Sequence, residues 1–381
     1  MALKYLYVPS AYKAATAYGV LPNAAAADLT FGRASNGSRI NKDKLIETES
    51  SNVPRLDYSS GSCPTLFTEV QTTNLLTYSE NFTDSDWVKS NSTVTANATI
   101  DPQGGNNGFL VSLNTSQAYL SQAVSFLAEA NTFSVYLKSP TVAGTYPLNW
   151  YAANGGNHHR ELVNVTTEWK RFEINFTPTG LGLRYVYIGD NRGAIGETLS
   201  SVYAWGAQVE SSPKATSYIK TETSAVTRSA DTGIVSGDLS SYINSTEGVL
   251  EFKASRSALK NAVISLSSSL TSGDNSVSLG FTSSTTVLFH KILSSGANVI
   301  TQTPSVVSVD LTQMNVVKLK WKDGDFQAKI NDTVFTILEG GGSLPFAATL
   351  KYLRIGYPND TSQDFAGAIQ YIKVYDSASD F

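Results

Sequence analysis

Residues Lys170–Phe176 read KRFEINF, and this stretch decides the fold class. Its apolar residues Phe172, Ile174 and Phe176 are each separated by one polar residue. Since successive side chains of a β-strand point to opposite faces, this pattern predicts a strand in a sheet with one buried face. Antiparallel β-sandwiches are built from such strands.

The same pattern recurs at short intervals along the chain. No helical pattern of about 10 to 15 residues separates the segments, so a sandwich is favoured over a βαβ arrangement. At Asp323-Gly324 the sequence indicates a tight hairpin, because Asp-Gly supplies the positive φ that such turns need. The other predicted strands are Thr132–Ser139, Tyr146–Ala152, Leu183–Asp190, Ser201–Glu210, Gly248–Ser255, Asn261–Ser269, Ser276–Ser283, Thr285–Ile292, Asn315–Gly324, Asp325–Phe335, Leu350–Pro358 and Phe365–Asp376.

Composition agrees with an all-β protein of more than one domain. A chain of 381 residues exceeds what one hydrophobic core usually serves. Tyr (19) and Phe (16) far outnumber Met (2), and aromatic residues suit pleated, half-buried surfaces. Only 16% of residues are charged, so the polar surface comes mainly from Ser, Thr, Asn and Gly. We therefore expect an extended N-terminal segment followed by two antiparallel β-sandwich (jelly-roll) domains.

Charge and cysteine content exclude several classes of function. The net charge of -4 and the pI near 5.5 do not indicate a basic surface that could bind nucleic acid. The single cysteine, Cys63, excludes an intrachain disulfide framework and a cysteine-based zinc site. No window approaches the roughly 18 to 20 apolar residues of a membrane span, and the start lacks the apolar run of a signal peptide.

Residues 1–72 differ from the rest of the chain. They contain four prolines and no clear period of 2 or 3.6, which predicts an extended segment. The segment is too apolar for a disordered linker, so we expect it to become ordered on the surface of a partner. The alternative is a flap packed on the domain that follows it. The candidate docking residues are Tyr5, Tyr7, Tyr12, Tyr18 and Phe31.

A polar, Thr/Ser-rich stretch, Ala215–Gly233, indicates an inter-domain boundary near residue 225. The predicted organisation is therefore a docking segment at 1–72, a first sandwich at 73–224 and a second sandwich at 225–381.

The last part of the chain resembles a known lectin family. The hairpin WKDGDFQAKIND (Trp321–Asp332) and the strand GAIQYIKVY (Gly367–Tyr375) look like the closing strands of concanavalin A-like (laminin G-like) jelly rolls. The resemblance covers roughly residues 230–381, and it implies the fold more strongly than a ligand.

The middle and N-terminal regions resemble parts of phage virion proteins. The stretches Thr73–Thr99 and Ala204–Thr221 are similar to carbohydrate-binding-module-like jelly rolls of phage fibres. Leu29–Leu76 is similar to a segment that precedes such domains. These resemblances imply a virion head or tail fibre or spike that attaches to other virion proteins by its N-terminal segment and displays its sandwiches to a host surface glycan.

The same resemblance sets expectations for assembly and location. Fibres close around a symmetry axis and gain avidity from weak sites, so we expect a homo-oligomer, with a trimer as our choice. Without a signal peptide, a protein made in the host cytoplasm would reach the outside in the virion, by lysis of the host. The alternatives are a glycan-cleaving depolymerase and a purely architectural protein that decorates a capsid or tail.

Sugar binding needs an exposed aromatic ring together with planar polar side chains. Two groups in the middle domain combine these properties, one around a Gly-rich loop and one on a later strand. Each of these aromatic residues could instead pack a core or a sheet face. The candidate residues are Trp150, Tyr151, Asn154, His158 and Arg160 in the first group, and Arg184, Tyr185, Tyr187 and Asp190 in the second.

No pattern for catalysis emerges. Glycan hydrolysis needs two carboxylates roughly 5 to 9.5 Å apart. The available acids are Glu251, Glu339, Asp323 and Asp325, but the E-x-D-x-x-E type of strand found in glucanase relatives is missing. We therefore expect a protein that is not an enzyme.

Metal binding has little support in the sequence. Adjacent His158 and His159 point to opposite faces of a strand, and His290 lies in the other domain. A structural calcium ion remains an option, since Glu80 and Glu210 would approach one another if the first and last strands of the middle domain pair. No other cofactor is implied.

Overall fold

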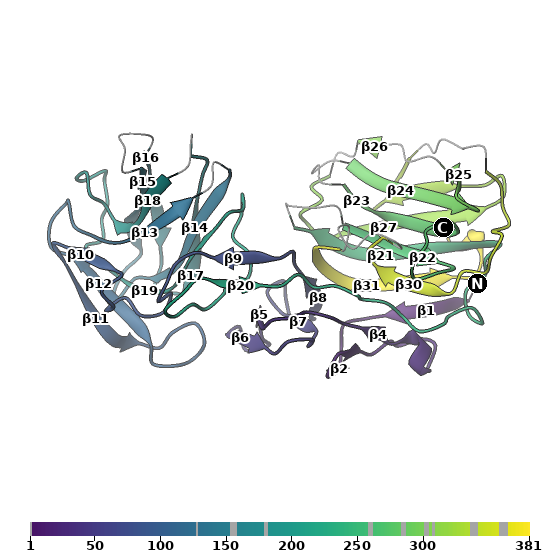
Figure 1. The fold of residues 1–381 in the computed structure, drawn as a ribbon, viewed down its shortest axis with the longest axis horizontal. Coiled ribbons are helices and arrows are strands. Elements are labelled where there is room, and N and C mark those ends of the chain that lie inside the picture. Colours follow the sequence, from purple (N-terminus) through teal and green to yellow (C-terminus); the bar gives the residue numbers. More distant parts are fainter. Residues whose placement is uncertain are drawn as a thin grey trace. The chain divides into compact units, whose positions relative to one another are not determined.

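The computed structural model describes residues 2–126, 129–152, 158–178, 182–257, 262–282, 287–300, 305–306, 309–335, 342–357 and 365–381. Across these ranges, every regular element is a β-strand or a three-residue 3-10 turn, namely Ala25–Ala27 or Ala378–Asp380. The sheets are antiparallel, which confirms the all-β prediction (Figure 1).

The chain forms two compact units. Unit 1 contains Met1–Lys44, Thr48–Gln71 and Ser229–Phe381, and unit 2 contains Leu45–Glu47 and Thr72–Arg228. The chain thus passes from unit 1 to unit 2 at Gln71/Thr72 and back at Arg228/Ser229, and Leu45–Glu47 also belongs to unit 2.

Unit 2 is a sandwich of two five-stranded sheets with a small additional pair, β9 (Thr72–Asn74) with β20 (Val226–Arg228). The first sheet has the order β10 (Val88–Ser90), β13 (Tyr119–Phe126), β18 (Gly182–Gly189), β15 (Gly144–Ala152) and β16 (His158–Val165). The second has the order β11 (Ser92–Thr99), β12 (Gly108–Leu113), β19 (Ser201–Glu210), β14 (Asn131–Lys138) and β17 (Lys170–Phe176).

Inward side chains of both sheets form one hydrophobic core in unit 2. The stretch KRFEINF is β17, and Phe172, Ile174 and Phe176 are all buried in that core, as predicted. Each such side chain contributes roughly 1.5–3 kcal/mol by leaving water. The alternation therefore fixes which side of each strand faces the core.

Unit 1 is a second sandwich. One sheet has the order β29 (Thr333–Phe335), β28 (Gln327–Ile330), β27 (Asn315–Lys322), β21 (Glu247–Arg256), β31 (Gly367–Tyr375), β8 (Thr65–Thr68) and β7 (Arg55–Asp57), and β1 (Leu3–Tyr7) also pairs with β31. The other has the order β25 (Ala297–Ile300), β24 (Val287–Ser294), β23 (Ser276–Phe281), β22 (Ala262–Ser267) and β30 (Tyr352–Ile355), with β26 (Ser305–Val306) paired to β24. The smaller sheets are β2 (Tyr12–Lys13), β3 (Thr16–Ala17) and β4 (Leu29–Thr30), and β5 (Gly37–Ile40) with β6 (Ile46–Glu49), whose first two residues are counted in unit 2.

The predicted hairpin at Asp323-Gly324 joins β27 to β28. Gly324 has φ of 68°, and the amide of Asp325 donates to the carbonyl of Lys322 at 2.8 Å. The positive φ expected of this glycine is therefore present.

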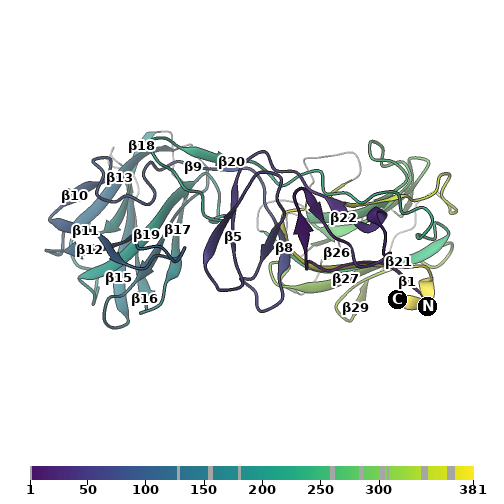
Figure 2. The ribbon, with the colours of Figure 1, turned by 90° about the horizontal axis from the view of Figure 1, so that it is seen from below.

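The N-terminal segment differs from the prediction of an extended piece ordered by a partner. It supplies β1, β7 and β8 to the larger sheet of unit 1, and β1 runs antiparallel to β31 with Leu3 opposite Tyr375. The amide of Ala2 donates to Asp376 at 3.2 Å, so the two chain ends lie side by side (Figure 2). The flap alternative is closer to the structure, although the sandwich it packs on is the last in the sequence.

Burial explains why the predicted docking residues cannot all face a partner. Tyr5, Tyr7 and Phe31 lie in the core of unit 1, and the Tyr5 hydroxyl donates to the carbonyl of Ala27 at 3.2 Å. Their apolar surface is removed from water by the protein's own sheets. Tyr12 is half-buried, with its hydroxyl donating to Glu49 at 2.9 Å, and Tyr18 is the exposed member of the set.

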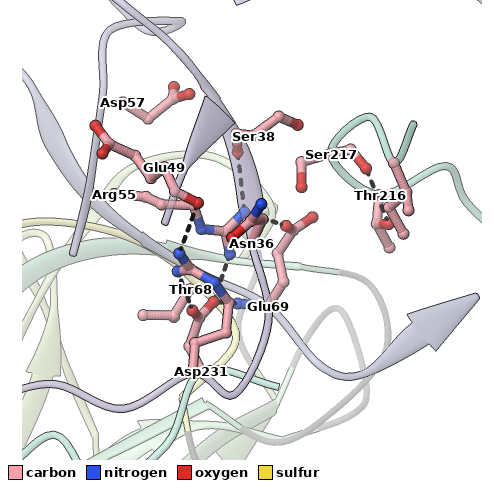
Figure 3. A network of polar contacts seen from close by, with 12 residues as sticks. Asn36, Ser38, Glu49, Arg55, Asp57, Thr68, Glu69, Thr216, Ser217 and Asp231 are labelled. Atoms are coloured by element: carbon pink, nitrogen blue, oxygen red, sulfur yellow. Dashed lines mark hydrogen bonds and ion pairs between the residues drawn. The ribbon is translucent and has the colours of Figure 1, made fainter. Parts of the chain in front are cut away.

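A buried ion cluster ties this segment to the C-terminal sandwich (Figure 3). Asp231 pairs with Arg33 at 3.0 Å and with Arg55, and Arg55 also pairs with Glu69 at 2.6 Å. Burial acts to lower the pKa of Arg55, but the charges of Asp231 and Glu69 outweigh it and raise that pKa. All four side chains are at most 5% exposed, so each charge depends on its partners.

We expect Asp231→Asn to destabilise unit 1 by about 3–5 kcal/mol, because two buried guanidinium groups lose their shared counter-charge. Calorimetry that resolves the unfolding of unit 1 measures the effect. Asp323→Asn, in an exposed turn, is the control and should change stability by no more than ~0.5 kcal/mol. Equal stability of the two variants would contradict the role given to Asp231.

Candidate functional site

Four tyrosines gather on the outer side of the first sheet of unit 2. On β18, Val186 and Ile188 belong to the core, so Tyr185 and Tyr187 point the other way. Tyr151 lies opposite Tyr185 in the pairing of β15 with β18. We call Tyr119, Tyr151, Tyr185 and Tyr187 the tyrosine face.

The rings of the tyrosine face pack against one another. The centroids of Tyr119 and Tyr187 are 5.0 Å apart in an edge-to-face arrangement, and those of Tyr185 and Tyr187 are 6.3 Å apart. Burial raises the pKa of the Tyr187 hydroxyl, and its three tyrosine neighbours raise it further against the lowering effect of Arg192. This hydroxyl therefore stays protonated at neutral pH, while the other three rings are half-buried.

Polar side chains continue the same row of the sheet. Asn149 lies opposite Tyr187 on one side and opposite Arg160 on the other. Asp190 holds this row in place, since it pairs with Arg160 and accepts from the Asn149 amide at 3.2 Å. The backbone amide of Arg192 also donates to Asp190, at 2.9 Å.

Arg192 adds a second guanidinium group, which lies 5.4 Å from the centroid of the Tyr151 ring. The face thus combines aromatic surface, two guanidinium groups and a buried carboxylate that orients one of them. Such a surface can stack a sugar ring and donate hydrogen bonds to its oxygens.

The structure brings together five of the residues predicted for sugar binding. Tyr151 and Arg160 came from the loop group, and Tyr185, Tyr187 and Asp190 came from the strand group. Because β15 pairs with β18, the two predicted groups form one face.

Two of the remaining predicted residues, Trp150 and Arg184, lie on the inner side of the sheet. Trp150 is 3% exposed and stacks on Phe176 with centroids 4.2 Å apart, so it is a core residue. Arg184 is buried on the side of β18 that carries Val186 and Ile188. Asn154 and the side chain of His158 lie outside the described residues.

Sequence reasoning missed Tyr119, Asn149 and Arg192. Asn149 could have been found, because it is two residues from Tyr151 and so shares its side of β15. Tyr119 could not, because nothing local to β13 says that this strand lies beside β18.

The proposed calcium pair is not brought together. The strands do run side by side, but antiparallel: Ser79 accepts from Ala207, and Val209 accepts from Leu75. Glu80 and Glu210 therefore lie at opposite ends of this pairing. Glu80 is bound by Lys220 at 3.0 Å and by the Tyr218 hydroxyl at 3.1 Å, and Glu210 accepts from the Thr216 amide at 2.9 Å.

Two of the four candidate catalytic acids are held by other groups. Glu251 pairs with Lys318 at 2.9 Å and accepts from the Tyr371 hydroxyl, while Asp325 pairs with Lys320 at 2.6 Å. Asp323 is exposed in its turn, and Glu339 and the side chain of His290 lie outside the described residues. Within the described part of the chain, no group of three His, Cys, Asp or Glu residues could hold a metal ion.

Two further features bear on the sequence predictions. Cys63 is exposed and carries a free thiol. The described residues include no helix with the length and apolar character needed to cross a membrane.

Comparison with known proteins yields matches among solved structures. No protein-family model and no curated protein matches the chain. The CBM40 module of the Ruminococcus gnavus IT-sialidase, bound to α2,3-sialyllactose, is 15% identical over 38% of this chain and 88% of the module, with a TM-score of 0.31. The enzymatically active domain of bacteriophage CBA120 tailspike protein 4 is 14% identical over 36% of this chain and 21% of that one, with a TM-score of 0.27.

Mouse laminin α1 domains LG4-5 are 9% identical over 68% of this chain and 86% of theirs, with a TM-score of 0.27. The structural neighbours thus include a carbohydrate-binding module and laminin G domains. At these identities and scores, none of the three carries its function over to this chain.

The stability of two variants can test whether Trp150 points into the core and the neighbouring tyrosines point outward. Trp150→Ala should destabilise unit 2 by about 3–5 kcal/mol, because it leaves a cavity in the core. Tyr185→Ala, on the half-buried outer side, should cost less than about 1 kcal/mol. Calorimetry of the two variants measures the difference, and a greater loss for Tyr185→Ala would reverse the assignment of faces.

Proposed function

We propose that this protein is a non-enzymatic structural component of a phage virion, a head or tail fibre or spike, that binds a host surface glycan through the tyrosine face. The cluster of four tyrosines flanked by Arg160 and Arg192 carries the glycan part of this proposal. The phage setting is supported by the resemblance of Leu29–Leu76, Thr73–Thr99 and Ala204–Thr221 to virion proteins.

The chemistry of the face suits a sugar. A pyranose has one apolar face that can lie on an aromatic ring, and its hydroxyls need donors and acceptors around the rim. Tyr151 and Tyr185 lie opposite each other on adjacent strands and offer such a platform. Arg160 is held by Asp190 and the Gly193 carbonyl, so it is already positioned before a ligand arrives.

Among the described residues, the tyrosine face does not contain the pair of carboxyl groups that a glycoside hydrolase uses. Hydrolysis of a glycosidic bond needs a pair of carboxyl groups across the bond. Asp190 is the carboxylate of this face, and it is 1% exposed and engaged by Arg160 and Asn149. A carboxylate so occupied is a positioning group for its neighbours.

Tyr5 and Tyr7 are buried in unit 1, so their side chains are not accessible for attachment to the particle. A virion contact would have to use other surface. Tyr18, which is 37% exposed, is the predicted docking residue best placed to take part.

A glycan array and a polysaccharide pull-down with the purified chain test adhesion. We expect Tyr185→Ala to weaken binding about 10-fold, equivalent to ~1.4 kcal/mol, since it removes one ring of the platform. The matched control is Tyr203→Ala, a half-buried tyrosine on the outer side of the other sheet. Equal losses in both variants would remove the tyrosine face as the site, and release of reducing ends from a bound polysaccharide would overturn the non-enzymatic assignment.

We also propose that the protein works as a homotrimer, because several weak sites on one particle gain avidity. Sedimentation velocity at micromolar concentration should then show a species of three times the 40.9 kDa chain mass. Observation of only the single-chain species with undiminished binding to a glycan surface would count against the trimer.

A further inference from the structure

Unit 2 contains a cleft that the tyrosine face does not use. It is formed by the segment after β9, strand β11, the start of β12 and the segment after Ile219, and its volume is about 440 Å³. This lies within the roughly 300–1,000 Å³ of small-molecule sites. We call it the Glu80 cleft, after the carboxylate in its wall.

The floor of the cleft is rigid and aromatic. Phe109 lines the cleft and is 3% exposed. It packs edge-to-face on Phe82 at 5.5 Å, and Phe82 packs in the same way on Trp87 at 5.0 Å. These rings belong to or adjoin the core of unit 2, so the floor is fixed before any ligand binds.

The walls carry both charged and uncharged polar groups. Glu80 is 7% exposed and is oriented by the Tyr218 hydroxyl and by Lys220. Its hydrogen bond and charge raise the pKa of Lys220, which stays a cation and a donor. The amides of Asn97 and Asn107 add donors and acceptors without charge.

Two lining residues adopt backbone conformations that are rare for residues other than glycine. Tyr78 has φ of 47° and Asn97 has φ of 54°. The left-handed region costs on the order of 1–3 kcal/mol for a bulky residue, and such strain collects at binding sites. Tyr78 is held there by its amide donating to the Glu222 carbonyl at 2.7 Å and by its own carbonyl accepting from Trp87 Nε1 at 3.1 Å.

The mouth of the cleft is acidic. The charge of Asp84 raises the pKa of the Tyr78 hydroxyl, and partial desolvation and the charges of Asp86 and Glu222 add to the effect. Glu222 is 78% exposed at this edge, and the cations that oppose these carboxylates are Lys220 and Lys89, which donates to the Thr83 and Asp84 carbonyls. An anionic ligand would meet net repulsion, whereas a neutral ligand rich in hydroxyls could use every donor and acceptor described.

We propose that the Glu80 cleft is a second sugar site, independent of the tyrosine face, that takes one or two rings of a neutral saccharide. Phe109 closes the bottom of the cleft, and Glu80, Lys220 and the two asparagine amides bind the hydroxyls of the ligand. The tyrosine face need not bind any sugar for this site to function.

The test uses the full chain labelled with 15N and three neutral disaccharides, lactose, maltose and cellobiose, as probes. We expect at least one to shift the amide resonances of Asn97, Asn107 and Lys220 saturably, with a Kd on the order of 1 mM. The same shifts should occur in Tyr185→Ala, which separates this site from the proposed adhesion site. Absence of saturable shifts at the cleft with all three probes would overturn the proposal, even if the tyrosine face binds.

A blocking variant shows whether the cleft itself is occupied. Ala96 is exposed on β11 and lines the cleft, so Ala96→Trp should weaken probe binding at least about 10-fold by filling it. Thr93→Trp places the same side chain at another exposed position of β11 and should leave the affinity within about twofold. Equal affinities for the two variants would contradict the assignment.

A charge variant tests why the ligand should be neutral. Wild-type protein should bind lactose at the cleft more tightly than 3′-sialyllactose, and Glu222→Lys should narrow that difference. Glu168→Lys makes the same charge change at an exposed position outside the cleft, and it should leave the difference between the two affinities unchanged. Tighter binding of 3′-sialyllactose than of lactose at the wild-type cleft, measured at the Asn97, Asn107 and Lys220 resonances, would overturn the neutral assignment.

Discussion

The antiparallel pairing of β15 with β18 is the constraint on which the candidate site depends. It sets Tyr151 opposite Tyr185 and Asn149 opposite Tyr187, from segments about 35 residues apart. Because side chains alternate with a period of two, a slip of one residue would turn these groups into the core and expose Trp150 and Val186. The core residues thus fix the register, and the register fixes the site.

Local alternation could be predicted from the sequence, whereas strand order could not. The stretch KRFEINF and the hairpin at Gly324 behave as expected, because each depends on neighbouring residues alone. Trp150 shows how local reasoning could have gone further: Trp150 and Tyr151 are adjacent in a strand, so both cannot lie on one face. Tyr119 required knowledge that β13 lies beside β18, a pairing across about 60 residues of chain.

The N-terminal segment marks the limit of prediction from pattern. Its strands have two to five residues, too few to display a period. What orders it lies far away in sequence: β31 offers an edge to β1 and β8, and Asp231 supplies the counter-charge for Arg33 and Arg55. The aromatic content predicted a segment that becomes ordered on a partner, but the surface that orders it is the chain's own last sandwich, as in the flap alternative.

The tyrosine face and the Glu80 cleft belong to different sheets and have opposite local charge. On the face, Arg160 pairs with the Asp190 carboxylate and the Arg192 guanidinium lies over Tyr151, while Glu80 and Glu222 both pair with the Lys220 ammonium group at the cleft. Both rest on core-packed strands, so little conformational entropy is lost when a ligand binds. Two rigid, individually weak sites that prefer different sugars would bind most tightly to a surface that carries both sugars. Binding at one site raises the effective concentration of the second sugar at the other site, so both sites become occupied together. A single site with a deeper pocket or a larger contact area would not give selectivity for the combination of two sugars.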